Sequence, residues 1–185
     1  MIFPLTNKVL RVSDDFGYGH FGASRGARTH KGVDYVGLEN TIVRSPVTGT
    51  ITKYGWAYDL EHNQRYIQIT KCGSDEKHRL FYTQMDTKLD VGDEIIEGAS
   101  VGFLGNISKM HDTQDKKMLN HLHYEIVIDG VHKDPEILYE KKNLDTIKSA
   151  PGGIFKIKKI HLILWLIVPS FLLAYYVYTK DSQIK

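Results

Sequence analysis

Two histidines stand one residue apart in the stretch "NHLHYE", residues 120 to 125. The apolar run that follows predicts a β-strand, and successive side chains of a strand point to opposite faces. His121 and His123 therefore share one face, roughly 7 Å apart along the chain, while Leu122 and Tyr124 share the other. Such a pair is either two surface residues or a source of metal ligands.

A second cluster upstream, "RTHKGVD", carries His30 and Asp34. Imidazoles and a carboxylate are ligand types that zinc prefers, and three protein ligands plus a water make an open site of the catalytic type. The alternative is a set of unrelated surface polar residues. The metal hypothesis requires the two clusters to meet in space.

The composition of the chain argues against several other classes of function. The chain has 185 residues, enough for one good-sized domain, and its hydrophobic fraction of 42% is that of a folded protein. A net charge of +2 and the lack of a basic stripe in the first 150 residues predict no nucleic-acid partner. Because Cys72 is the only cysteine, the chain can form neither an internal disulfide nor a thiolate zinc site.

Residues 1–139 are expected to form an all-β domain, an antiparallel, sandwich-like sheet. Its short runs are rich in β-branched and aromatic residues and are separated by Gly, Asn and Asp clusters; they include "GTITKYGW", "RYIQITK", "HRLFYTQ" and "HYEIVI". No stretch of residues 8–139 keeps a helical period over three turns. The long polar loop over residues 106–120 arrives beside the histidine pair and is expected to form a rim or lid.

The C-terminal part differs in composition. Residues 140–159 are polar, lysine-rich and interrupted by "PGG", which predicts a basic linker. Residues 160–179, "IHLILWLIVPSFLLAYYVYT", contain no Asp, Glu, Lys or Arg, and twenty helical residues cover about 30 Å of hydrocarbon. We expect one transmembrane helix there, with residues 180–185 as a short tail; the alternative is a buried core helix. The N-terminus has no charged n-region or long apolar run, so no secretory signal is expected.

Several segments, in this order, resemble the zinc metallopeptidases of the LytM or lysostaphin type, the M23 family: "DDFGYGHFGASRGARTHKGVDY", "VRSPVTGTITKYG", "RYIQITK", "LDVGDEIIEGASVGFLGN" and "NHLHYEI". The resemblance covers about residues 13–139. It is closest to a branch that shares "FGASRGARTHKGVD" with leukocyte cell-derived chemotaxin, a non-enzymatic animal protein on the same fold. The resemblance therefore implies a LytM-type β fold.

The resemblance also implies roles for particular residues. The zinc ligands of such proteins fall on His30, Asp34 and His123, and a catalytic histidine that helps to activate the zinc-bound water falls on His121. The family's second catalytic histidine falls on Gln84, in "FYTQMD". A glutamine can donate a hydrogen bond to an oxyanion, but it cannot exchange a proton.

Tyr82 is a candidate to replace the missing group, because it lies two residues before Gln84 and shares its face if the strand is regular. His78 and His111 are further candidates that the sequence cannot place. Arg25 and Arg28, in "SRGAR", are suited either to binding a substrate carboxylate or to a solvated rim.

Two functions remain open at this point. One is a membrane-anchored zinc endopeptidase acting on peptide bonds of peptidoglycan. The other is a zinc-containing, non-catalytic module that recognises a wall peptide, a glycan or a protein. Lysines 156, 158 and 159 precede the apolar segment, whereas only Lys180 and Lys185 follow it, so the positive-inside rule places the β-domain in the cytoplasm, away from peptidoglycan. Either the rule fails for so short a tail, or the domain meets its substrate after the membrane is breached.

Overall fold

The computed structural model describes residues 1–58 and 64–149. The chain divides into two compact units, Met1–Glu140 and Lys141–Lys185. The first unit contains all the strands of the described residues and the candidate site.

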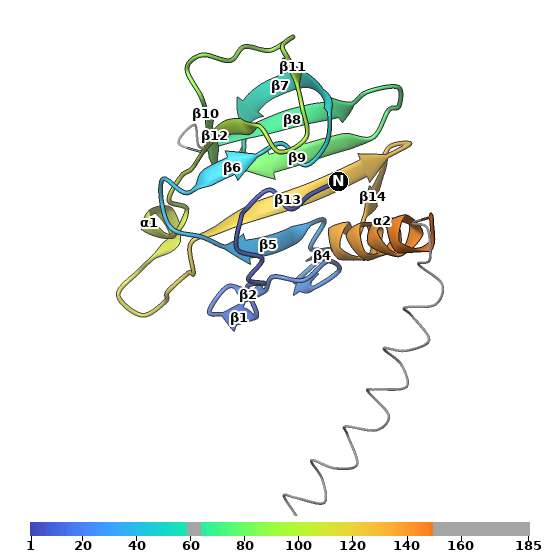
Figure 1. Cartoon of the computed structure of the whole chain (residues 1–185). Helices are drawn as coiled ribbons and strands as arrows, with labels where there is room; N and C mark the ends of the chain where they lie inside the picture. The colour runs from blue at the N-terminus through green and yellow to red at the C-terminus, as the bar shows by residue number, and fades with distance from the viewer. Residues whose placement is uncertain (59–63, 150–185) are drawn as a thin grey trace, which may run out of the picture. The chain divides into compact units, whose positions relative to one another are not determined.

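An antiparallel sheet of seven strands dominates this unit (Figure 1). Its strands run in the order β11, β7, β8, β9, β13, β14, and β5 pairs with the first half of β13 on the side away from β9. The bounds are β5 (Val33–Val36), β7 (Gly49–Trp56), β8 (Arg65–Lys71), β9 (Lys77–Phe81), β11 (Glu94–Ile95), β13 (His121–Ile128) and β14 (Val131–Lys133). The mostly β, antiparallel architecture expected from the sequence is confirmed.

Smaller sheets complete the β structure. A three-stranded antiparallel sheet runs in the order β10, β12, β6, and two two-stranded ribbons lie near the N-terminus. The bounds are β6 (Ile42–Arg44), β10 (Thr83–Met85) and β12 (Ser100–Leu104) for the sheet, and β1 (Ser13–Asp14), β2 (Gly17–Tyr18), β3 (Ser24–Arg25) and β4 (Arg28–Thr29) for the ribbons. Both ribbons precede β5, so they position the chain that enters the site.

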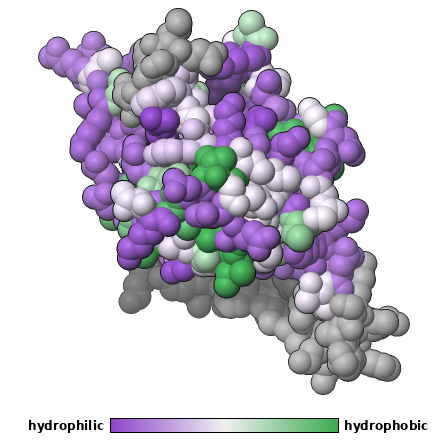
Figure 2. Space-filling view, turned by 90° about the horizontal axis from the view of Figure 1, so that it is seen from above, coloured by the Kyte–Doolittle hydropathy of each residue, from purple (hydrophilic) through white to green (hydrophobic). Residues whose placement is uncertain are grey.

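Branched aliphatic side chains fill the core. Ile51, Ile67, Ile69, Leu80 and Ile126 are completely buried. Burying a side chain of this size stabilises the fold by roughly 1.5–3 kcal/mol. Hydrophilic residues cover most of the face seen in Figure 2, with a small apolar group near its centre.

Strand β13 has two different buried faces. Leu122, Tyr124 and Ile126 belong to the apolar core. His121, His123 and Glu125 point to the opposite face, as the period of two requires. This strand, which lies between β9 on one side and β5 and β14 on the other, therefore carries core packing on one face and polar chemistry on the other.

Two helices were not expected from the sequence. The short α1 (Ser108–His111) lies in the predicted rim loop, and α2 (Pro135–Ser149) follows β14. Pro135 is suited to the first turn of a helix because its missing N–H has no partner to lose there. The backbone N–H of Glu136 donates to the Asp134 carboxylate at 2.9 Å. Residues 140–149, predicted as part of a linker, are thus helical; their polar sequence gave no apolar period to reveal it.

The membrane prediction falls outside these residues. Within the described ranges, no helix is long and apolar enough to cross a bilayer. The predicted transmembrane segment, residues 160–179, lies outside the described residues.

Candidate metal centre

The pairing of β5 with β13 brings the two sequence clusters together. His123 and Asp34 are direct partners across this antiparallel pair. His30 lies just before β5, and its backbone N–H donates to the Ala23 carbonyl at 2.8 Å. The spatial condition of the metal hypothesis is therefore met.

Three ligand atoms form a small triangle. His123 Nδ1 lies 2.8 Å from Asp34 Oδ1 and 2.9 Å from His30 Nε2. His30 Nε2 lies 3.1 Å from Asp34 Oδ1. Zinc ligands at about 2.0–2.2 Å from the ion stand roughly 3.3 Å apart in a tetrahedron, so a shift of a few tenths of an ångström would accommodate an ion. Among the described residues, this trio is the one group of His, Cys, Asp and Glu side chains with metal-ligand spacing.

Hydrogen bonds on the far side of each imidazole favour metal binding. His30 Nδ1 donates to the His20 carbonyl at 2.8 Å, which leaves Nε2 facing the triangle. His123 Nε2 donates to Glu125 Oε1 at 3.2 Å, which leaves Nδ1 facing it. Partners of this kind fix the orientation of a metal-binding imidazole and raise its basicity.

Arg11 holds the carboxylate ligand from behind. Its Nε and Nη2 donate to Asp34 Oδ2 at 3.1 and 2.7 Å, while Nη1 lies 2.6 Å from Asp14 Oδ2. The Arg11 and Asp34 side chains are each only 2% exposed. Because Oδ2 is occupied by the guanidinium, Oδ1 is the oxygen left for a metal.

The protonation states follow from burial and these contacts. Burial alone would raise the pKa of Asp34, but hydrogen bonds from His123 and His30 hold it well below its usual range. Burial alone would lower the pKa of His123, but the Asp34 and Glu125 carboxylates raise it to about 9. In the metal-free protein His123 is therefore protonated at neutral pH, and metal binding must displace that proton.

His121 lies beside the triangle. Its Nδ1 donates to the Leu119 carbonyl at 2.7 Å, and its Nε2 stands 3.7 Å from Asp34 Oδ1. Burial lowers the pKa of His121 to about 4, although Asp34 opposes this shift. A neutral imidazole with a free Nε2 lone pair can accept a proton at neutral pH.

Tyr82 reaches the same cavity through an irregular backbone. Its φ of 61° interrupts the chain between β9 and β10, in a region that non-glycine residues seldom adopt. The Tyr82 ring stands edge-on to His121, with centroids 5.4 Å apart, and its hydroxyl lies 3.0 Å from that of Tyr58. Burial, with Tyr58 close by, raises the pKa of Tyr82 well above 10, so the phenol remains a hydrogen-bond donor.

Gln84 does not share this site. Its side chain is exposed on β10, accepts a hydrogen bond from the Tyr54 hydroxyl at 3.3 Å, and lines a separate hollow that includes Glu39 and Lys109. Tyr82 and Gln84 were expected to share a strand face only if the strand were regular, and it is not regular here. The left-handed turn at Tyr82 breaks the alternation on which this expectation depended.

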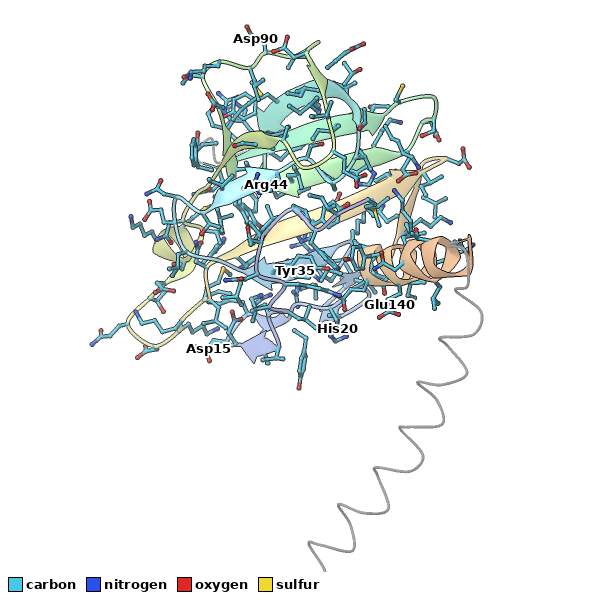
Figure 3. The ribbon with its side chains drawn as sticks, viewed as in Figure 1. Asp15, His20, Tyr35, Arg44, Asp90 and Glu140 are labelled. Atoms are coloured by element: carbon cyan, nitrogen blue, oxygen red, sulfur yellow. The ribbon has the colours of Figure 1, made fainter. Side chains whose placement is uncertain are left out.

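The triangle, His121 and Tyr82 line one cavity of about 390 Å³. Its other walls include apolar Phe16 and Met118 and the cationic Arg25, Arg28 and Lys31. The ribbons before β5 supply several of these lining residues, among them Arg25 and Arg28. His20, labelled in Figure 3, lies beside β4, and Asp15, at the β1–β2 turn, accepts a hydrogen bond at 2.7 Å from the Lys117 N–H of the loop before β13. A peptide segment could be held there with one carbonyl beside the triangle.

Two residues that support the triangle were not predicted from the sequence, and one predicted candidate lies outside the cavity. Glu125 lies two residues after His123, so the strand period alone could have placed it on the same face. Arg11 lies 23 residues before Asp34, and no spacing signal connects them. His78 is buried among Glu76 and Tyr124, on the core side of the sheet, and does not reach the cavity.

Comparison with known proteins gives a consistent result. The model of peptidase family M23 matches residues 28–135. The chain is 25% identical, over 127 residues, to the peptidoglycan DD-endopeptidase ShyC of Vibrio cholerae serotype O1; the match covers 68% of this chain and 26% of ShyC. The chain thus spans about a quarter of the length of that curated relative.

Two solved structures share the fold. The catalytic domain of the antimicrobial peptidase lysostaphin from Staphylococcus simulans aligns with a TM-score of 0.52 and 21% identity, over 67% of this chain and 90% of that one. LytU aligns with a TM-score of 0.53 and 20% identity, over 74% and 88%. These likenesses establish the LytM-type β architecture.

Proposed function

Because the chain belongs to peptidase family M23, we propose that it is a zinc-dependent endopeptidase that hydrolyses peptide bonds of bacterial peptidoglycan. The observation that carries this proposal is the triangle of His30, Asp34 and His123 with His121 Nε2 beside it, 3.7 Å from Asp34 Oδ1. A zinc ion held by these three residues would supply a water of lowered pKa and a Lewis acid for the scissile carbonyl.

The chain's own residues supply the rest of the chemistry. His121 Nε2 accepts the proton of the attacking water and returns it to the leaving amine, a role typically worth 10²-fold to 10⁴-fold in rate. The Tyr82 hydroxyl remains protonated and donates a hydrogen bond to the oxyanion, a role worth roughly 10²-fold to 10³-fold. Arg11 keeps Asp34 oriented, and Phe16 and Met118 exclude water from one side of the cavity.

The substrate class is inferred from two sources. The family resemblance implies wall peptides, and the relative ShyC is named a peptidoglycan DD-endopeptidase. The cavity of about 390 Å³ beside the triangle has room for a peptide segment. A wall peptide is therefore the substrate we propose.

A non-catalytic module is the second candidate function. Gln84 lies outside the cavity, and among the described residues His121 is the one cavity histidine that is not part of the triangle. The sequence resemblance to leukocyte cell-derived chemotaxin favours the same alternative. In that case the zinc site would stabilise the fold, and the cavity would bind a wall peptide, a glycan or a protein partner without cleaving it.

The experiment is zinc analysis and peptidoglycan digestion with the purified full-length chain. We expect about one zinc per chain and release of soluble fragments, which His121→Ala abolishes and Tyr82→Phe lowers by about 10²-fold. Gln84→Ala is the matched control and should retain full activity, because its side chain faces another hollow. Zinc without turnover, with binding of intact peptidoglycan retained, would instead support the non-catalytic module.

We further propose that residues 160–179 anchor the chain as a single-pass membrane protein. The lysines before the segment favour a cytoplasmic β-domain, whereas the proposed substrate lies outside. Cys72, the sole cysteine, is exposed on the β-domain and can report its side. Labelling of Cys72 in intact cells by a membrane-impermeant maleimide would place the domain outside, and labelling only after lysis would place it inside.

A further inference from the structure

A cluster of positive charge lies on the ribbon that leads into the metal centre. In the pair of β3 and β4, Arg25 and Arg28 are direct cross-strand partners, joined by the turn at Gly26 with a φ of 71°. Like charges directly opposite each other destabilise an antiparallel pair. Two arginines at this position therefore cost stability unless an anion lies between them.

The cluster faces the cavity. Arg25, Arg28 and Lys31 all line it, and Lys31 directly follows the ligand residue His30. Arg25 is held in place, since its Nη2 donates to the Tyr18 carbonyl at 2.6 Å and lies 3.5 Å from Asp34 Oδ2. Arg28 and Lys31 are exposed, so their charged ends are accessible from the cavity mouth.

Asp34 Oδ2 forms a long ion pair with Arg25 Nη2 at 3.5 Å, but within the described residues no cavity carboxylate pairs with Arg28 or Lys31. Asp34 is taken up by Arg11 and the imidazoles of the triangle. Glu125 pairs with Arg79 and His132 at 3.3 Å each, in addition to His123. Across residues 1–58 and 64–149, the structure records no ion pair for Arg28 or Lys31.

We propose that Arg28 and Lys31, with Arg25 behind them, bind a free carboxylate of the peptide substrate beside the scissile bond. An arginine fork matches a carboxylate in two parallel hydrogen bonds, and a lysine adds a point charge. The bound anion would relieve the repulsion between Arg25 and Arg28. The inference rests on the proposed peptidase function, which it deepens by naming the feature selected in the substrate.

The test compares two wall-derived peptide dimers with the same backbone, one with free carboxylates on its stem peptides and one with carboxamides. For the full-length, zinc-loaded chain we expect kcat/KM to be about 10-fold to 100-fold higher for the carboxylate form, mostly through KM. Arg28→Gln should bring the two substrates within about threefold of each other. Lys88→Gln, a matched loss of an exposed charge away from the cavity, should preserve the full preference.

A binding measurement separates this inference from the proposed function. Fluorescent versions of the two peptides are titrated into the full-length His121→Ala variant, which does not need to turn over. Tighter binding of the carboxylate peptide without any cleavage by the wild type would uphold the inference and reject the peptidase. Cleavage of both dimers with equal kcat/KM would uphold the peptidase and overturn the inference. In the binding assay, the inference would also be overturned if inorganic phosphate displaced the labelled peptide at a lower concentration than the unlabelled carboxylate peptide does.

Discussion

Replacing Arg11 by methionine tests whether a buried ion network holds the metal centre together. The guanidinium makes two hydrogen bonds to Asp34 and one ion pair with Asp14. Methionine retains much of the apolar stem but leaves both carboxylates without this partner. Removing one member of a buried ion pair typically costs about 3–5 kcal/mol. Because Asp34 keeps its contacts with His30 and His123, we expect a loss near the lower value, about 3 kcal/mol.

Urea unfolding of the full-length chain, with zinc removed by a chelator, measures this loss directly. The double variant Arg11→Met/Asp14→Asn should recover part of it, because one uncompensated carboxylate is then gone. Zinc titration of Arg11→Met should show an affinity about 10-fold to 100-fold weaker, the usual effect of losing a residue that orients a metal ligand. A loss under about 1 kcal/mol with unchanged zinc affinity would show that Arg11 is dispensable and that the triangle forms without it.

Three further perturbations have defined outcomes. The His78 hydrogen bond lowers the pKa of Glu76 from 4.5 to about 2. The ionised carboxylate therefore stabilises the fold above pH 4.5, and this stabilisation is lost as the pH falls towards 2. In urea melts, Glu76→Gln should be less stable than wild type at pH 7 and equally stable near pH 2. Zinc at 100 times its Kd should stabilise the wild type by about 2.7 kcal/mol, and a thermal melt of His30→Ala should show no such gain. Gly102→Ala should unfold at a clearly lower urea concentration than wild type, because its new Cβ would lie 2.0 Å from the Gln84 carbonyl oxygen on the neighbouring strand; an unchanged midpoint would mean that β10 and β12 can separate without cost.

The candidate metal triangle could be named from the sequence because the family resemblance assigns its residues to two short, recognisable motifs. One strand period places His121 and His123 on the same face, and the short segment from His30 to Asp34 carries the other two ligands. Only the pairing of β5 with β13 had to be supplied by the fold. The ligands therefore depend on a single long-range contact between two short, recognisable segments.

Two other features have no comparable local signal. The contact of Arg11 with Asp34 depends on the path of the two ribbons between them, which contain several glycines and little apolar pattern. The conformation of Tyr82 depends on a backbone with positive φ at a residue type that rarely adopts it. Tertiary packing sets both features.

The two faces of β13 explain how the residues of the candidate metal centre are held in position. The polar row of β13 borders the cavity, and its members are largely buried, so each of these groups needs a partner in the protein. His121 has Leu119, His123 has Asp34 and Glu125, and Glu125 in turn has Arg79. Each partner also fixes the orientation of the group that it satisfies, so the contacts that make burial tolerable place the ligands in advance. The core face of the same strand, packed through Leu122, Tyr124 and Ile126, then holds the row in register with β5 and β9 on either side.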